Sequence, residues 1–243
     1  SSRYAHYACA MFFKGLSETS HKTFPDTLTT VNYSSHGITL NRGMIANHLP
    51  DFFLFGRLGA LDMYFSEDWI FGGLGSWGNG LWQRVAYLTD LLRAGGRHHH
   101  RPHPITGMHV IPNGYQPLAK GIDHTVPARV NLLLGRGTKI FSFFTYGPTA
   151  RGTIDFWGDN APAMRGVGDA TAMVGDPEIE PLLFAGHPVP AQTCLLYGTT
   201  AERWQHANDA DACNQEKQYT YMMLQQEQIP LDIVDTFDIV RFL

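Results

Sequence analysis

Strand-like and helical segments alternate four times between residues 27 and 145. The strand-like segments are rich in β-branched and aromatic residues: 27–33 (TLTTVNY), 60–65 (ALDMYF), 105–111 (ITGMHVI) and 138–145 (TKIFSFFT). Consecutive parallel strands need a crossover connection of about a dozen residues or more, usually a helix. The alternation therefore predicts an α/β fold with a parallel sheet covered by helices rather than an antiparallel meander.

Glycine and proline mark the ends of the helices. Pro50 and Gly59 bracket a short helix over 51–58, and Pro127 is expected to begin a later helix. The clearest helix precedes Gly95-Gly96 and has one apolar stripe: Leu81, Val85, Leu88 and Leu92. The chain opens in an amphipathic helix, which Gly15 can end, with apolar residues at helical spacing: Tyr4, Tyr7, Ala8, Met11 and Phe12.

A second pattern follows the segment 186–190 (GHPVP), whose composition is typical of a linker. It consists of a strand over 192–197, a helix over 214–228 and a strand over 231–234. The helix is expected to turn three residues inward: Tyr219, Met222 and Met223. One βαβ unit is too small to be an independent sheet. We therefore expect two domains, 1–187 and 188–243, with the second either docked on the first or continued in a longer protein.

Charge and composition favour a small or neutral ligand. The chain has 18 Lys and Arg against 22 Asp and Glu, so it lacks the basic surface that nucleic acid or an anionic membrane requires. No apolar run approaches the roughly 20 residues of a membrane span. No phosphate-binding loop (GxxxxGK[ST]) or nucleophile elbow (GxSxG) is present, and we expect no cofactor.

The histidines of the segment 97–103 (RHHHRPH) suggest a metal site at first sight. Adjacent histidines in an irregular segment seldom converge on one ion, and these follow a helix C-terminus, where cationic side chains suit the helix dipole. Cys9, Cys194 and Cys213 are too scattered for a disulfide framework or a metal site. No metal is expected.

Polar and aromatic residues collect where the strands end, which is where parallel α/β barrels carry their functional groups. The expected catalytic residues are the carboxylates Glu67 and Asp68, which can act as acid, base or nucleophile on a glycosidic bond. The alternative is a helix cap or an ion pair in a loop. The expected substrate-binding residues are Asn32, Tyr33, Trp69, Asn113, Tyr146 and Trp157. Trp157 lies in a loop rich in Gly and Asp, where it can stack on a sugar or pack on the rim.

The order of these segments resembles the latter half of a glycoside hydrolase family 42 β-galactosidase, or of the wider group that has a β-galactosidase trimerisation domain. The similar segments are TLTTVNY, DFFLFGRLGALDMYFSEDW, ITGMHVIPNGYQP and ARVNLLLGRGTKIFSFFTYGP, followed by VPAQTCLLYGTTAERW and EKQYTYMMLQQEQIPLDIVDTFDI. The resemblance implies that 1–187 is the second half of a (β/α)8 barrel. It implies that 188–243 begins a flavodoxin-like, amidotransferase-like domain. It also implies a carbohydrate substrate and a homo-oligomer, with a trimer as one form.

Two departures from the family concern its catalytic glutamates. The general acid/base of the family lies at the end of the fourth barrel strand, which would precede Ser1. The nucleophile lies at the end of the seventh strand, where this chain has residues 108–113 (MHVIPN) and no carboxylate. Two hypotheses remain open: a glycoside hydrolase in which Glu67 or Asp68 is catalytic, and a non-catalytic carbohydrate-binding or structural subunit of an oligomer. In both, the rest of the barrel would come from the same or a tightly bound chain.

Overall fold

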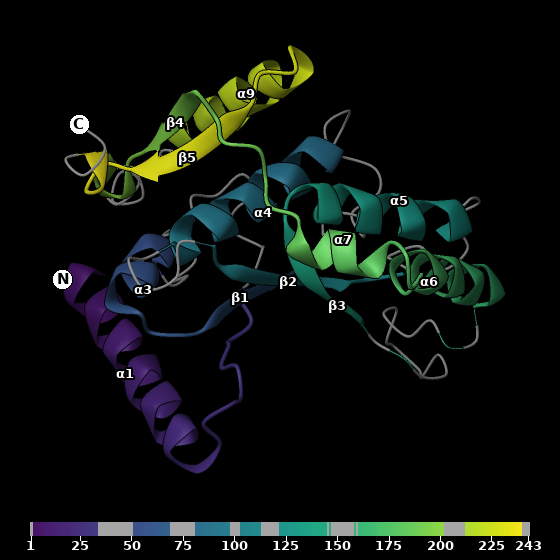
Figure 1. The fold of residues 1–243 in the computed structure, drawn as a ribbon. Coiled ribbons are helices and arrows are strands. Elements are labelled where there is room, and N and C mark those ends of the chain that lie inside the picture. Colours follow the sequence, from purple (N-terminus) through teal and green to yellow (C-terminus); the bar gives the residue numbers. More distant parts are fainter. Residues whose placement is uncertain are drawn as a thin grey trace.

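The fold is α/β, with two parallel sheets and helices packed against them (Figure 1). The computed structural model describes residues 2–33, 51–68, 81–97, 103–112, 122–144, 146, 158, 160–201 and 212–239. The described strands form neither a closed barrel nor a complete flavodoxin-like sheet. None of the helices in these ranges has the length and apolar character to cross a membrane.

The larger sheet consists of three parallel strands in sequence order: β1 (Met63–Glu67), β2 (Ile105–Val110) and β3 (Thr138–Phe143). Asn32 adds a parallel bridge to Phe65 on the other side of β1, and the backbone N–H of Tyr33 donates to the Phe65 carbonyl over 2.7 Å. The predicted parallel sheet is confirmed. The expected first strand, 27–33, is reduced to this single bridge.

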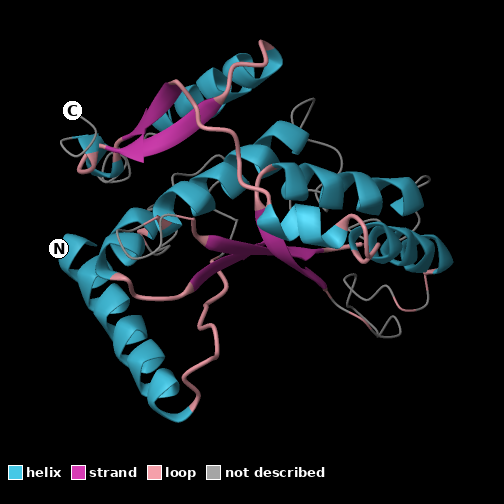
Figure 2. Cartoon of the chain, viewed as in Figure 1, coloured by secondary structure: helices cyan, strands magenta, loops and turns pink. Residues whose placement is uncertain are grey.

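Three helices cover one face of this sheet: α3 (Phe52–Leu58), α4 (Leu81–Gly96) and α5 (Ile122–Gly135) (Figure 2). Beneath them lies an aromatic core in which the Tyr33 and Tyr64 rings stack with centroids 4.9 Å apart. α3 and α4 pack backbone to backbone, because a Cβ at Gly56 would lie only 1.9 Å from the Gly95 carbonyl oxygen. These contacts fix the strands relative to the helix layer.

Gly59 ends α3 as predicted, and Asp51, which was expected inside the helix, is its N-cap. Asp51 caps the helix by accepting from the Leu54 N–H at 3.0 Å, and Gly59 ends it with φ 58°. At α5 the expected start is wrong, because the helix begins at Ile122 and includes Pro127. Pro127 lies five residues after that start, inside the helix, and not at its first position as expected.

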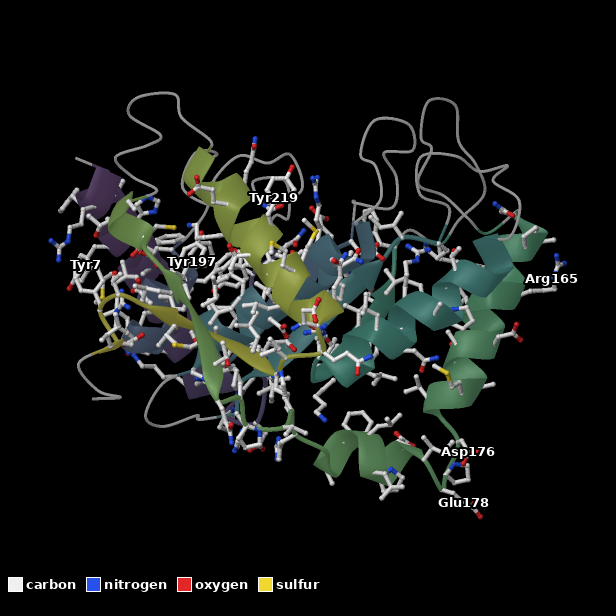
Figure 3. The ribbon with its side chains drawn as sticks, turned by 90° about the horizontal axis from the view of Figure 1, so that it is seen from above. Tyr7, Arg165, Asp176, Glu178, Tyr197 and Tyr219 are labelled. Atoms are coloured by element: carbon white, nitrogen blue, oxygen red, sulfur yellow. The ribbon has the colours of Figure 1, made fainter. Side chains whose placement is uncertain are left out.

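The first helix, α1 (Ser2–Thr23), runs past Gly15, so the expected end there is wrong. Its apolar stripe faces outward: the exposed side chains include Tyr4, Tyr7, Met11, Phe12 and Leu16. Tyr7 is seen at the margin of the molecule in Figure 3. The buried side contains Ala10 and Ser17, and the Ser17 hydroxyl is 2.6 Å from that of Thr29.

Beyond β3, α6 (Ala161–Val174) packs on α5, and α7 (Glu180–Ala185) leads into the irregular segment 186–191. The predicted βαβ unit then follows as β4 (Thr193–Tyr197), α9 (Ala212–Gln226) and β5 (Leu231–Asp235), with β4 parallel to β5. The expected inward face of α9 is wrong in part. Tyr219 and Met223 are exposed, as Figure 3 shows for Tyr219, and Tyr221 is buried instead.

The βαβ unit is docked on the helix layer through arginine–carboxylate contacts. Arg57 of α3 lies 2.6 Å from Asp235 at the end of β5. Arg136, just after α5, donates to Asp90 of α4 at 2.6 Å and to the hydroxyl of Tyr221 of α9 at 2.8 Å. We refer to Arg57, Asp235, Arg136, Asp90 and Tyr221 as the docking contacts.

Candidate functional site

A row of polar side chains crosses the larger sheet near the carboxyl ends of its strands. In the parallel register, Glu67 of β1 is the partner of His109 of β2, and His109 is the partner of Ser142 of β3. Register partners on neighbouring strands project from the same face. All three side chains are partly exposed. A carboxylate, an imidazole and a hydroxyl therefore stand side by side, and we refer to Glu67, His109 and Ser142 as the polar row.

The row lies on the face opposite the helix layer. Side chains alternate along a strand, so Phe65 and Glu67 share one face, whereas Tyr64 and Ser66 share the other. Tyr64 packs beneath α3 and donates from its hydroxyl to the Phe52 carbonyl over 3.2 Å. Ser66 donates to the carbonyl of Tyr33. The helix face is thus filled by core contacts, and the polar row belongs to the other face.

Asn32 extends the row past Glu67. Its side-chain amide donates to Oε2 of Glu67 at 3.1 Å, and its backbone forms the bridge to β1. The predicted site residues Asn32 and Glu67 are therefore in contact although they are 35 positions apart in the chain. This contact engages Oε2, one of the two carboxylate oxygens of Glu67.

His109 sits in the middle of the row between two aromatic rings. Its ring centroid is 4.3 Å from that of Phe65 and 5.5 Å from that of Phe144. Burial against these rings lowers the pKa of His109, and the nearby carboxylate of Glu67 opposes part of that shift. Its Nδ1 is buried and has no hydrogen-bond partner in the described part of the chain. The lowered pKa favours the neutral imidazole at pH 7.

Asp68, the second predicted catalytic carboxylate, lies on the opposite side of the strand from Glu67 and is fully buried. Its Oδ2 is 2.9 Å from Nη1 of Arg129, and its Oδ1 accepts from the Ile111 N–H at 2.8 Å. Burial raises the pKa of Asp68, while the Arg129 guanidinium acts against that rise. Arg129 also donates to the Ile111 carbonyl at 3.0 Å. Asp68 therefore joins the ends of β1 and β2 to α5 and is not brought to the polar row.

The other predicted substrate-binding residues fall into three groups. Tyr33 is fully buried in the aromatic core, and its ring contacts those of Phe52 and Tyr64. The structure therefore does not place Tyr33 at the row. Tyr146 follows β3 and is 68% exposed. The remaining three lie outside the described residues: Trp69, Asn113 and Trp157.

Sequence reasoning missed His109 and Ser142. Both lie inside segments correctly expected to be strands, but only the register shows that they are neighbours of Glu67. The types in the row are also those of a Ser-His-Glu triad. Among the hydrogen bonds of the described residues, however, His109 makes none with Ser142 or Glu67, which a working triad requires.

Within the described residues, no group of three or more His, Cys, Asp or Glu side chains is arranged to hold a metal ion. The histidines at 98–100 lie outside the described residues. Gly73, Gly75 and Gly78 have the GxGxxG spacing of a dinucleotide loop. In such loops the first glycine directly follows the strand, whereas five residues separate Gly73 from the end of β1.

Comparisons with known proteins give no relative. No family model matches the chain, no curated protein matches it, and no solved structure matches it. The likeness to family 42 β-galactosidases thus depends on the sequence segments alone, and the polar row has to be interpreted from its own chemistry.

Proposed function

We propose that this chain is part of a glycoside hydrolase in which Glu67 acts as an acid/base group on a bound carbohydrate. The observation that carries the proposal is the polar row of Glu67, His109 and Ser142, extended by Asn32, at the carboxyl ends of consecutive parallel strands. In (β/α)8 enzymes catalytic residues come from the ends of several different strands. Four segments contribute one polar group each here.

The architecture is proposed on the same basis. Residues 1–187 would be the second half of a (β/α)8 barrel, because strands in sequence order with helices on one face are the arrangement of neighbouring barrel units. Residues 188–243 would begin a flavodoxin-like domain of the trimerisation type. The remaining barrel strands would come from the same or a tightly bound chain, and the assembly would be a homo-oligomer.

The chemistry of the row suits a sugar. Carboxylate, amide, imidazole and hydroxyl groups pair with sugar hydroxyls, and the Phe65 and Phe144 rings beside His109 offer apolar surface. A glycosidase needs a second carboxylate about 5 to 10 Å from the first. Since Asp68 is held in the core by Arg129, that second group would be contributed by the rest of the barrel.

The second candidate is a non-catalytic carbohydrate-binding subunit on the same fold. Its support is that the polar row contains a single carboxylate, with Asp68 directed into the core. In that case Glu67 and Asn32 would serve as ligands for sugar hydroxyls, and no proton transfer would occur.

Hydrolysis of a panel of aryl glycosides by the full protein tests the proposal. Glu67→Gln keeps the shape of the side chain and removes its proton transfer, so we expect turnover to fall roughly 100-fold to 10,000-fold. Glu178→Gln is the matched control, because Glu178 is an exposed carboxylate in the turn before α7 (Figure 3).

Sugar binding by calorimetry separates the two candidates. If the wild type binds the sugar but does not hydrolyse it, and Glu67→Gln loses that binding, the result supports the non-catalytic subunit. A wild type that neither binds nor hydrolyses any member of the panel, or equal kinetics in the two variants, would reject a role of Glu67 on carbohydrates.

A further inference from the structure

An open cavity lies at the opposite end of the strands from the polar row. It has a volume of about 280 Å³ and is lined by the end of α4, the residues before β2, the segment 188–191 and the start of β5. Its walls therefore come from both the helix layer and the docked βαβ unit. The cavity and the polar row lie at opposite ends of β2, which puts them roughly 15 Å apart at a rise of about 3.3 Å per residue.

The polar lining of this cavity consists of Arg93, Arg97, His103 and the carboxylate of Asp232. Arg97 contacts both oxygens of Asp232 at 2.6 and 2.8 Å and donates to the Ile233 carbonyl at 2.9 Å. Arg93 lies 3.2 Å from Asp90, and Arg136 also binds that carboxylate, at 2.6 Å. Three guanidinium groups thus share two carboxylates, which leaves one positive charge in excess in this network, although Arg136 itself does not line the cavity.

Two imidazoles lie at the rim. His103 lines the cavity and its ring stacks on that of His187, with centroids 4.2 Å apart and planes at 23°. The cavity thus offers guanidinium and imidazole donors, the groups that bind phosphate.

The rest of the lining is apolar. It consists of Pro104, Pro188, Val189, Pro190, Ala191 and Leu231. Proline walls hold their shape without a bound ligand, which lowers the entropy lost on binding. A ligand that fits both parts has an anionic head and a compact apolar body.

We propose that this cavity binds a small organic phosphate, with its phosphate group at Arg93, Arg97 and His103 and its body against the prolines. A phosphate dianion is attracted to this single excess charge more strongly than a monovalent carboxylate is. Because its contacts come from both sides of the junction, a bound phosphate stabilises the docked arrangement by mass action. The site is independent of the proposed chemistry at Glu67.

Calorimetric titration of the full protein with pyrophosphate tests the proposal, with acetate at equal ionic strength as the second probe. We expect saturable binding of pyrophosphate at one site, at least tenfold tighter than acetate, with a rise in Tm. The double variant Arg93→Gln/His103→Asn should weaken pyrophosphate binding at least tenfold. Arg165→Gln should leave it unchanged, because Arg165 is exposed on α6 (Figure 3) and does not line the cavity.

A measurement on the wild type covers the case in which the double variant fails to fold. Imidazole NMR signals of His103 and His187 should shift together with the calorimetric saturation, whereas that of His21 on α1 should not. Absence of saturation, equal affinity for acetate, or unchanged His103 signals at saturating pyrophosphate would overturn the proposal.

Discussion

Glu67 and Asp68 are adjacent in the chain but have opposite environments. Glu67 is partly exposed beside Asn32, whereas Asp68 is fully buried against Arg129. The sequence predicts that a carboxylate pair follows an apolar strand, but the face that each occupies depends on where the strand ends. The expected strand, 60–65, stops two residues before the observed β1 does. That difference decides which carboxylate is available for chemistry.

His109 makes the row sensitive to pH. Burial lowers its pKa in the folded protein, so the unfolded chain takes up the proton first as the pH falls. The contribution of His109 to stability is therefore complete above pH 6.5 or so and is lost as the pH falls from there through its lowered folded pKa.

We expect His109→Gln to reduce the loss of unfolding free energy between pH 8 and pH 5. Urea denaturation of both proteins at a series of pH values measures it. Comparing how the unfolding free energy changes with pH in the two proteins removes the contribution of the other histidines. Parallel curves for the two proteins would show that His109 is not responsible.

At the scale of the elements, local signals are predicted well and tertiary ones are not. The limits of α3 follow from the cap at Asp51 and the left-handed Gly59, which act within one turn. α1 shows the converse. Its exposed stripe and its continuation past Gly15 depend on packing against α3, where Lys14 donates to the Leu58 carbonyl at 3.0 Å. That partner cannot be deduced from periodicity.

Two glycine-to-alanine changes should have opposite effects. In Gly56→Ala the new Cβ meets the Gly95 carbonyl oxygen at 1.9 Å, so α3 and α4 must separate, at a cost of about 3 kcal/mol or more. In Gly15→Ala the new Cβ has nothing within 4 Å, and the gain is about 0.5–1 kcal/mol from helix propensity.

Chemical denaturation of the two variants shows directly whether each change raises or lowers the free energy of unfolding. A Gly56→Ala protein as stable as the wild type would contradict the close packing of α3 on α4. A destabilised Gly15→Ala would mean that the outer side of α1 is not open at that position.

At the scale of the whole molecule, the docking of the βαβ unit is the main feature that the sequence leaves undecided. The sequence is compatible with two alternatives: the βαβ unit docks on the first domain, or it continues in a longer protein. Docking rests on contacts between residues remote in sequence, such as the Tyr221 hydroxyl and Asp90, which are 131 positions apart. No local pattern reveals such pairs. Burial raises the pKa of Asp90, and the Arg136 and Arg93 guanidiniums oppose that rise.

Loss of one docking contact should weaken the whole molecule. Arg136→Met leaves the buried Asp90 with fewer partners, and breaking a buried pair costs about 3 kcal/mol or more. Glu18→Gln is the control, because it removes an exposed i,i+4 pair with Lys14 that is worth about 0.3–0.5 kcal/mol. Scanning calorimetry should show one transition in the wild type and a lower Tm in Arg136→Met. A separate low-temperature transition already in the wild type would contradict stable docking.

The central claim is that Glu67 performs proton transfer on a sugar, and chemical rescue tests it most directly. Glu67→Ala should lose about 100-fold to 10,000-fold in aryl glycoside hydrolysis, and added formate or azide should restore part of it by occupying the place of the carboxylate. Glu178→Ala should show neither effect. Full activity of Glu67→Ala, or a loss that no concentration of formate or azide reverses while the variant stays folded and binds the sugar, would contradict the assignment.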